Sequence, residues 1–300
     1  MASSAAAPST PTSKDTRPVF IYGTAWKKDQ TVRLVKEALI SGFRRIDTAA
    51  QPRHYQEHLV GQALRESYRS RLVKREDVYV QTKYTTPAGQ DLDNMPYHPL
   101  DPLETQISTS VASSLKNLRH REESENDSFL DCLLLHSPLP TIEETLQAWE
   151  ILETYVPGQI NALGISNVTL PILQTIYENS KVKPSVVQNR FYPATSYDVA
   201  LRAFCSEHGI TYQSFWTLTG NPKLLKSNSV SVLAESARVN KAVALYALVA
   251  NLGVEVLNGT TSAEHMEVDV AGVDAVRIWA SGNEKKWAQI TASFAKSIAI

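Results

Sequence analysis

The chain has 300 residues, of which 43% are hydrophobic and 20% are charged, and this composition excludes a disordered or fibrous protein. A formal net charge of -1 and a pI near 6.7 argue against nucleic acid or an anionic membrane as a partner. No stretch reaches the roughly 18 consecutive apolar residues of a membrane-spanning helix, and Cys132 and Cys205 are spaced neither as a metal site nor as a disulfide framework. We therefore expect a cytoplasmic protein that is a monomer or a weak homo-oligomer.

Along the chain, residues 1–17 are small and polar and predict a flexible tail, and residues 18–300 predict a single folded domain. Short apolar runs predict strands within 18–23, 43–49, 77–84, 128–138, 161–167, 184–191, 210–215 and 253–260. Amphipathic patterns predict helices within 30–41, 55–70, 103–118, 141–155, 170–179, 197–208, 230–252 (in two pieces) and 262–270. A C-terminal helical extension follows, with Trp287, Ile290 and Phe294 on the side expected to pack on the barrel wall.

Eight alternations of strand and helix in about 260 residues predict an α/β fold, the (β/α)8 TIM barrel. A doubly wound sheet is the alternative, but the first strand is followed by "GTAWKKDQ", which lacks the Gly-x-Gly-x-x-Gly turn of most dinucleotide-binding sheets. In a barrel, segments that follow strands lie on the catalytic face. The long connections 85–102 and 216–229 are therefore expected to form binding loops, and the charged segment 119–128 to be a solvated loop on the opposite face.

Polar residues stand at the carboxyl ends of the predicted strands, namely Asp47, Lys83, His136, Ser166, Asn167 and Gln188. A lysine in an apolar strand needs a carboxylate partner, which Asp47 can supply. The paired ammonium would favour the phenolate of Tyr55 and lower the pKa of that tyrosine. Tyr55 would then protonate a carbonyl oxygen while His136 orients the carbonyl by a hydrogen bond.

From about Val19 to Val273 the sequence resembles the aldo-keto reductase family, in the segments "GTAW", "RRIDTA", "VGQAL", "VYVQTKY", "DCLLLHSP", "LGISN", "VVQNRFYP" and "GVEVLNGTTSAEHM". The resemblance implies an eight-stranded α/β barrel without a metal, and a nicotinamide cofactor, NADP(H) with NAD(H) as the alternative. By that similarity Asp47, Tyr55, Lys83 and His136 match the catalytic tetrad, with Tyr55 as the proton donor.

The resemblance also implies which residues surround the cofactor and the substrate. Ser166, Asn167 and Gln188 match the residues that hydrogen-bond the nicotinamide carboxamide. Phe215 matches the aromatic residue on which the nicotinamide ring stacks, with Trp216 beside it as the alternative. Trp26 and Tyr84 match walls of the substrate pocket. The segment after the last strand is expected to bind the cofactor through Asn258, Gly259, Thr260, Thr261 and His265.

Two departures from the family pattern stand out. Tyr55 lies eight residues after Asp47 instead of the usual five, a position that Pro52 occupies, so the inserted segment must bulge and Tyr55 is expected to begin the next helix early. His54 and His58 are then expected at the rim. Relatives that prefer NADP(H) carry Lys and Arg after the last strand where Gly259 and His265 stand here, which predicts NADPH binding with reduced discrimination against NADH.

Three functions remain open at this level. The leading one is NAD(P)H-dependent reduction of an aldehyde or ketone. The remodelled segment between Asp47 and Tyr55 leaves room for a cofactor-binding enzyme of non-redox chemistry, such as dehydration, isomerisation or cyclisation. A catalytically silent binding subunit would have lost a tetrad residue, and all four are present.

Overall fold

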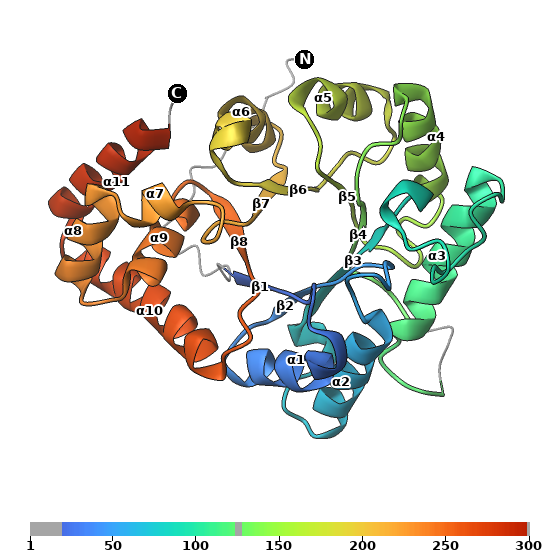
Figure 1. The fold of residues 1–300 in the computed structure, drawn as a ribbon, viewed down its shortest axis with the longest axis horizontal. Coiled ribbons are helices and arrows are strands. Elements are labelled where there is room, and N and C mark those ends of the chain that lie inside the picture. Colours follow the sequence, from blue (N-terminus) through green and yellow to red (C-terminus); the bar gives the residue numbers. More distant parts are fainter. Residues whose placement is uncertain (1–19, 124–127, 299–300) are drawn as a thin grey trace, which may run out of the picture.

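The structure is a computed structural model that describes residues 20–123 and 128–298, so the tail expected at 1–17 lies outside the described residues. Eight parallel strands form a closed barrel in sequence order (Figure 1). They are β1 (Phe20–Gly23), β2 (Arg45–Asp47), β3 (Tyr79–Tyr84), β4 (Cys132–Leu135), β5 (Leu163–Ser166), β6 (Val186–Arg190), β7 (Thr211–Phe215) and β8 (Val254–Asn258). Because β8 pairs with β1, the sheet has no open edge, which confirms the predicted (β/α)8 barrel and excludes the doubly wound sheet.

Helices surround the barrel and cover its outer face (Figure 1). They are α1 (Thr31–Ile40), α2 (Glu57–Arg69), α3 (Leu103–Asn117), α4 (Ile142–Glu153), α5 (Leu170–Asn179), α6 (Val199–Glu207), α7 (Pro222–Leu225), α8 (Asn228–Ala237), α9 (Lys241–Ala250), α10 (Ala263–Ser281) and α11 (Glu284–Ile298). Apolar side chains between strands and helices form the main core, and the fully buried Trp149 of α4 is the largest of them. The sequence pattern therefore located every strand and most helices within a few residues.

Two of the predicted helix starts that were wrong lie beside the barrel mouth. Tyr55 does not begin α2, because residues 52–54 form a turn and the helix starts at Glu57. The helix predicted from Tyr197 starts at Val199, because Ser196, Tyr197 and Asp198 have φ angles of 49°, 52° and 50°, in the left-handed region. Helix periodicity does not register such local turns, since they change the backbone without changing the apolar pattern.

The apolar side of the last helix is buried, but its main contacts are with outer elements of the fold and not with the strands of the barrel wall. Ile290 and Phe294 of α11 are buried, and Trp287 packs partly buried against the core. The contacts of α11 are with α8, α10 and the 3-10 turn Pro193–Asp198, and Figure 1 shows α11 beside α8 at the outer edge of the molecule. Within the described residues, no helix combines the length and the apolar character that a membrane crossing requires.

The strand register decides which side chains enter the barrel. Side chains alternate between the two faces of a strand, so Gln81 and Lys83 of β3 point to the same side. Asp47 is in register with Gln81, and Gln188 with Gln213, which places these residues at corresponding heights in the barrel. The result is a polar layer inside the barrel beneath its carboxyl end, and Gln213 connects it to Glu255 and through that residue to Arg45.

Candidate active site

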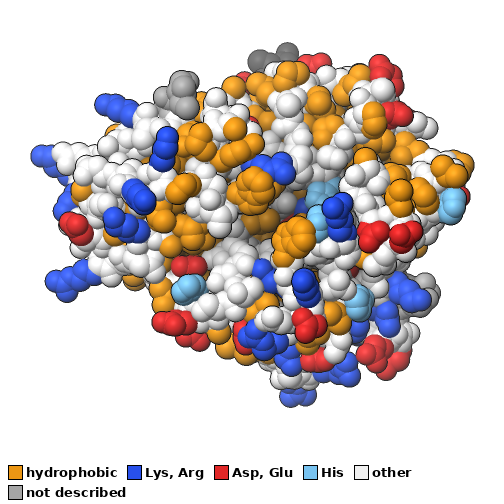
Figure 2. Space-filling model, in the orientation of Figure 1, with side chains coloured by type: hydrophobic (Ala, Val, Ile, Leu, Met, Phe, Trp, Pro, Cys, Tyr) orange, Lys and Arg blue, Asp and Glu red, His pale blue; other side chains and the backbone are white. Residues whose placement is uncertain are grey.

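A cavity of about 770 Å³ opens at the carboxyl end of the strands. Figure 2 shows the molecule hollowed near its centre, with hydrophobic side chains and Lys, Arg and His side chains around the hollow. Of the two long connections, residues 216–219 line this cavity, whereas residues 85–102 do not. The second connection therefore lies at the cavity, where a binding loop was expected, and the first does not line it.

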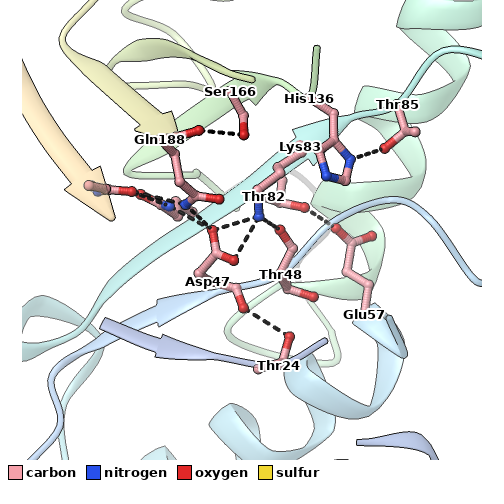
Figure 3. A network of polar contacts seen from close by, with 12 residues as sticks. Thr24, Asp47, Thr48, Glu57, Thr82, Lys83, Thr85, His136, Ser166 and Gln188 are labelled. Atoms are coloured by element: carbon pink, nitrogen blue, oxygen red, sulfur yellow. Dashed lines mark hydrogen bonds and ion pairs between the residues drawn. The ribbon is translucent and has the colours of Figure 1, made fainter. Parts of the chain in front are cut away.

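Asp47 and Lys83 form a buried ion pair at the floor of the cavity (Figure 3). The Lys83 Nζ donates to both carboxylate oxygens of Asp47, at 2.6 and 2.7 Å, and to the carbonyl of Thr48 at 2.9 Å. Their side chains are only 1% and 2% exposed, so each charge depends on the other for neutralisation. The pair predicted from the sequence is thus present.

Glutamine amides complete the surroundings of the carboxylate. Asp47 Oδ1 also accepts from Gln81 Nε2 at 2.6 Å and from Gln188 Nε2 at 2.9 Å. Both amides donate in turn to Gln213 Oε1. Gln81, Gln188 and Gln213 are each the only glutamine of their strand. This pattern is visible in the sequence and could have pointed to Gln81 and Gln213. This network fixes the Asp47 carboxylate from below.

The bulged segment carries Tyr55 to the cavity. Residues 51–54 form a turn in which the amides of His54 and Tyr55 both donate to the carbonyl of Gln51, at 3.1 and 3.0 Å. The Gln51 side chain is tied to the carbonyl of Gly89, and the Trp26 amide donates to the His54 carbonyl. The inserted residues are therefore held on both sides, which positions Tyr55 despite its unusual spacing from Asp47.

Tyr55 lies among the other predicted catalytic residues. The Lys83 Nζ is 5.2 Å from the centre of the Tyr55 ring. The ring of His136 is 6.1 Å from that of Tyr55, measured between centroids, at an angle of 71°. Asp47, Tyr55 and His136 all line the cavity, and Lys83 is paired with Asp47. The fold thus brings together four residues that lie up to 89 positions apart in the sequence.

The expected direction of the Tyr55 pKa was wrong. Burial raises the pKa of Tyr55 above its usual value near 10, and the negative charge of Asp47 raises it further. The Lys83 ammonium does not reverse this, because Asp47 already neutralises it and because burial lowers the pKa of Lys83 itself, against the opposing effect of Asp47. At neutral pH the phenol of Tyr55 therefore keeps its proton.

His136 is held as a neutral imidazole. Burial, followed by the positive charges of Lys83, His54 and Arg190, lowers the pKa of His136 to about 3. Its Nδ1 lies 2.6 Å from the hydroxyl of Thr85, and the two share a hydrogen bond (Figure 3). When the Thr85 hydroxyl donates, the imidazole proton sits on Nε2. His136 can then donate a hydrogen bond without carrying a charge.

The residues matched to the nicotinamide lie on adjoining strands. Ser166 Oγ donates to the carbonyl of Gln188 at 2.6 Å, and Asn167 Nδ2 donates to the carbonyl of His136 at 2.9 Å. Ser166, Asn167 and Gln188 line the cavity together with Phe215 and Trp216. Asn167 and Trp216 have φ angles of 54° and 58°, a left-handed conformation that costs side-chain-bearing residues roughly 1–3 kcal/mol and clusters at functional sites.

The segment after β8 lines the opposite end of the cavity with Asn258, Gly259, Thr260 and His265, whereas Thr261 is exposed outside it. Lys27 reaches this segment from the loop after β1, and its Nζ donates to the Gly259 carbonyl at 2.5 Å. Burial lowers the pKa of Lys27, and among the described residues no carboxylate pairs with it. The sequence analysis missed Lys27, although "WKK" directly after the first strand was a visible signal.

The two residues expected to wall the substrate pocket differ in position. Trp26 lies at the cavity mouth, 65% exposed, with its ring 3.8 Å from that of His54. Tyr84 does not line the cavity: it is buried outside the barrel, where its hydroxyl donates to Gln106 of α3. The expectation for Tyr84 fails because Lys83 points inward, so the next side chain of the strand must point outward. His58 is exposed and lies outside this cavity.

Two further residues at or near the cavity were not predicted from the sequence. Arg190, the last residue of β6, lines the cavity beside Asn167. Glu57, the first residue of α2, is buried behind the ion pair and accepts hydrogen bonds from Thr82, Ser114 and Asn117. Within residues 20–123 and 128–298, no group of three or more His, Cys, Asp and Glu side chains is arranged to hold a metal ion.

Residues 19–297 match the model of the aldo/keto reductase family. The chain belongs to this family. Aldo-keto reductases reduce carbonyl compounds with NAD(P)H, and the chain is an NAD(P)H-dependent oxidoreductase.

The chain is also similar to several proteins named as reductases. The chain is 29% identical over 264 residues to a methylglyoxal reductase of Escherichia coli O157:H7, covering 83% of this chain and 85% of that one. It is 28% identical over 207 residues to 2,5-diketo-D-gluconic acid reductase B of a Corynebacterium species, covering 69% and 65%. It is 29% identical over 215 residues to an NAD/NADP-dependent indole-3-acetaldehyde reductase of Schizosaccharomyces pombe, covering 67% and 65%. The chain thus spans just under two thirds of the last two relatives.

Solved structures agree on the fold. An aldo-keto reductase of Bombyx mori in complex with NADP superimposes with a TM-score of 0.69 at 20% sequence identity, covering 88% of this chain and 89% of that one. At this identity the likeness concerns the barrel, and the roles of individual residues rest on the geometry of the cavity described above.

Proposed function

We propose that this aldo-keto reductase reduces an aldehyde or ketone to an alcohol, with Tyr55 as the proton donor. The observation that carries the proposal is the meeting of Tyr55 and His136 in one cavity above the buried Asp47–Lys83 pair. A nicotinamide cofactor, when bound in this cavity, would supply the hydride that reduces the carbonyl carbon. The chain itself has to bind the carbonyl oxygen, orient it and deliver a proton to it.

Each residue of the site has a part in that proton transfer. His136, neutral and protonated on Nε2, donates a hydrogen bond to the carbonyl oxygen and orients it toward Tyr55. Tyr55 keeps its proton in the resting site because its pKa is raised, and it gives the proton up when the carbonyl oxygen becomes basic during reduction. The Lys83 ammonium, 5.2 Å from the Tyr55 ring, then stabilises the phenolate that remains. Asp47 keeps that ammonium charged in a buried position.

The cavity residues fit a phosphorylated nicotinamide dinucleotide, for which we propose NADP(H). A buried ammonium without a carboxylate partner among the described residues, Lys27, stands against the segment Asn258–Thr260. Desolvating a cation at such a position is costly unless an anion pairs with it, and a phosphate of the cofactor is such an anion. Lys27 thereby compensates in part for the Lys and Arg that Gly259 and His265 replace.

The test is NADPH oxidation with a panel of aldehydes and ketones, run on the wild type and on Tyr55→Phe. We expect the variant to lose at least about 100-fold in kcat, because it removes only the proton donor, and to retain nearly the same NADPH affinity in a fluorescence titration. Tyr68→Phe is the matched control: the Tyr68 hydroxyl is buried without a hydrogen-bond partner among the described residues, and it lies outside the cavity. Product formation without matching NADPH consumption would instead support the non-redox alternative.

A further inference from the structure

Arg190 presents a guanidinium group to the cavity from the carboxyl end of β6. Its Nη1 donates to Asn167 Oδ1 at 2.7 Å. The guanidinium carbon lies 5.2 Å from the ring centre of Phe215 and 4.8 Å from that of Trp216. Both rings are therefore within the range of a cation–π contact with the guanidinium. Arg190 is therefore fixed in position and still lines open space.

No carboxylate of the described chain pairs with this guanidinium. Two other partly buried arginines do have such partners, Glu255 for Arg45 at 3.1 Å and Asp131 for Arg75 at 2.7 Å, whereas Arg44 and Arg202 donate to backbone carbonyls instead. Arginine has five N–H donors, and within residues 20–123 and 128–298 Arg190 uses one of them, toward Asn167. A half-buried cation in a cavity with unused donors favours an anionic ligand.

The position of Arg190 relates that ligand to the reacting carbonyl. Asn167, which accepts from Arg190, also donates to the backbone carbonyl of His136 at 2.9 Å. The positive charge of Arg190 is close enough to contribute to the lowered pKa of His136. An anion bound by Arg190 would therefore share one cavity of about 770 Å³ with a carbonyl held by His136 and Tyr55.

We propose that Arg190 binds an anionic group of the substrate, a carboxylate or a phosphate, and so selects anionic aldehydes and ketones over neutral ones. The inference rests on the proposed carbonyl reduction and specifies its substrate class. The guanidinium suits either anion, since its paired N–H groups match two oxygens at once. The hydrogen bond to Asn167 and the contacts with Phe215 and Trp216 restrict the side chain, which reduces the conformational entropy lost on binding.

The experiment compares matched pairs of substrates in the NADPH-oxidation assay. For the carboxylate the pair is 4-carboxybenzaldehyde and its methyl ester, and for the phosphate it is glyceraldehyde 3-phosphate and glyceraldehyde. We expect the wild type to favour the anionic member of at least one pair by about tenfold or more in kcat/KM, mainly through KM, and the pair that shows the preference identifies the anion. In Arg190→Met that ratio should fall by about tenfold or more, since a charged hydrogen bond contributes roughly 1.5–3 kcal/mol.

Two further variants control the comparison. Arg190→Lys keeps the charge without the paired N–H groups and should recover part of the preference. Arg202→Met removes another arginine that lies over an aromatic ring, that of Phe191 at 5.7 Å, but outside the cavity, and the ratio between the substrates should stay as in the wild type.

The outcomes separate this inference from the function on which it rests. An unchanged substrate ratio in Arg190→Met overturns it. Equal losses for both members of each pair, together with weaker NADPH binding in a fluorescence titration, also overturn it, because Arg190 would then serve to hold Asn167 for the cofactor. Reduction of the neutral substrates by the wild type without any preference for the anions overturns the inference alone. Failure to reduce every carbonyl compound overturns the proposed function as well.

Discussion

Replacing Lys83 by Met tests the buried ion pair, because the substitution keeps most of the side-chain volume and removes only the ammonium. Asp47 Oδ1 would still accept from Gln81 and Gln188, but Oδ2 would lose the donor that lies 2.7 Å away. Removing one partner of a buried pair leaves an uncompensated charge, which costs about 3–5 kcal/mol. We expect the free energy of unfolding to fall by that amount.

Urea unfolding at fixed neutral pH measures the effect. Lys36→Met is the matched control, because Lys36 pairs with Glu66 at 3.0 Å on the surface, where such a pair contributes about 0–1 kcal/mol. The double variant Asp47→Asn with Lys83→Met should lose less stability than the two single variants together, since neither charge is then left alone. A loss from Lys83→Met no larger than that from Lys36→Met, or strict additivity in the double variant, would refute the reasoning.

Two further predictions concern the cofactor and a buried acid. In a fluorescence titration, Lys27→Met should weaken NADPH binding by about tenfold or more and should weaken NADH binding less. Lys28→Met, at the exposed neighbouring position, is the control and should leave both affinities unchanged. Equal weakening of the two cofactors would place Lys27 away from the extra phosphate. Burial raises the pKa of Glu57, so the folded state binds a proton that the unfolded state has released, and Glu57 should make the wild type less stable as pH rises above about 4.5. In Glu57→Gln this loss should be absent, so the stability of the variant relative to the wild type should improve from pH 4.5 to 7. If the difference in the free energy of unfolding between variant and wild type did not change with pH, the raised pKa would be contradicted.

Much of the fold could be predicted because its signals are local. The strands appear as short apolar runs, and the polar residues at their ends appear in sequence order, so Asp47, Lys83 and His136 could be named before their contacts were known. The resemblance of "RRIDTA" and "DCLLLHSP" to the family pattern further supported the choice of Asp47 and His136. Tyr84 was misplaced because the motif identifies a position on the strand, while the alternation of side chains decides which face that position occupies.

The sequence by itself determined that eight strands alternate with helices, and that an acid, a lysine and an imidazole stand where those strands end. Only the tertiary structure decided that the sheet closes, that the turn at 51–54 delivers Tyr55, and that Lys27 and Arg190 share its cavity. It also decided the direction of the Tyr55 pKa, because burial outweighs a lysine charge that Asp47 already neutralises. Burial and pairing depend on residues that are distant in the chain, and no local pattern contains them.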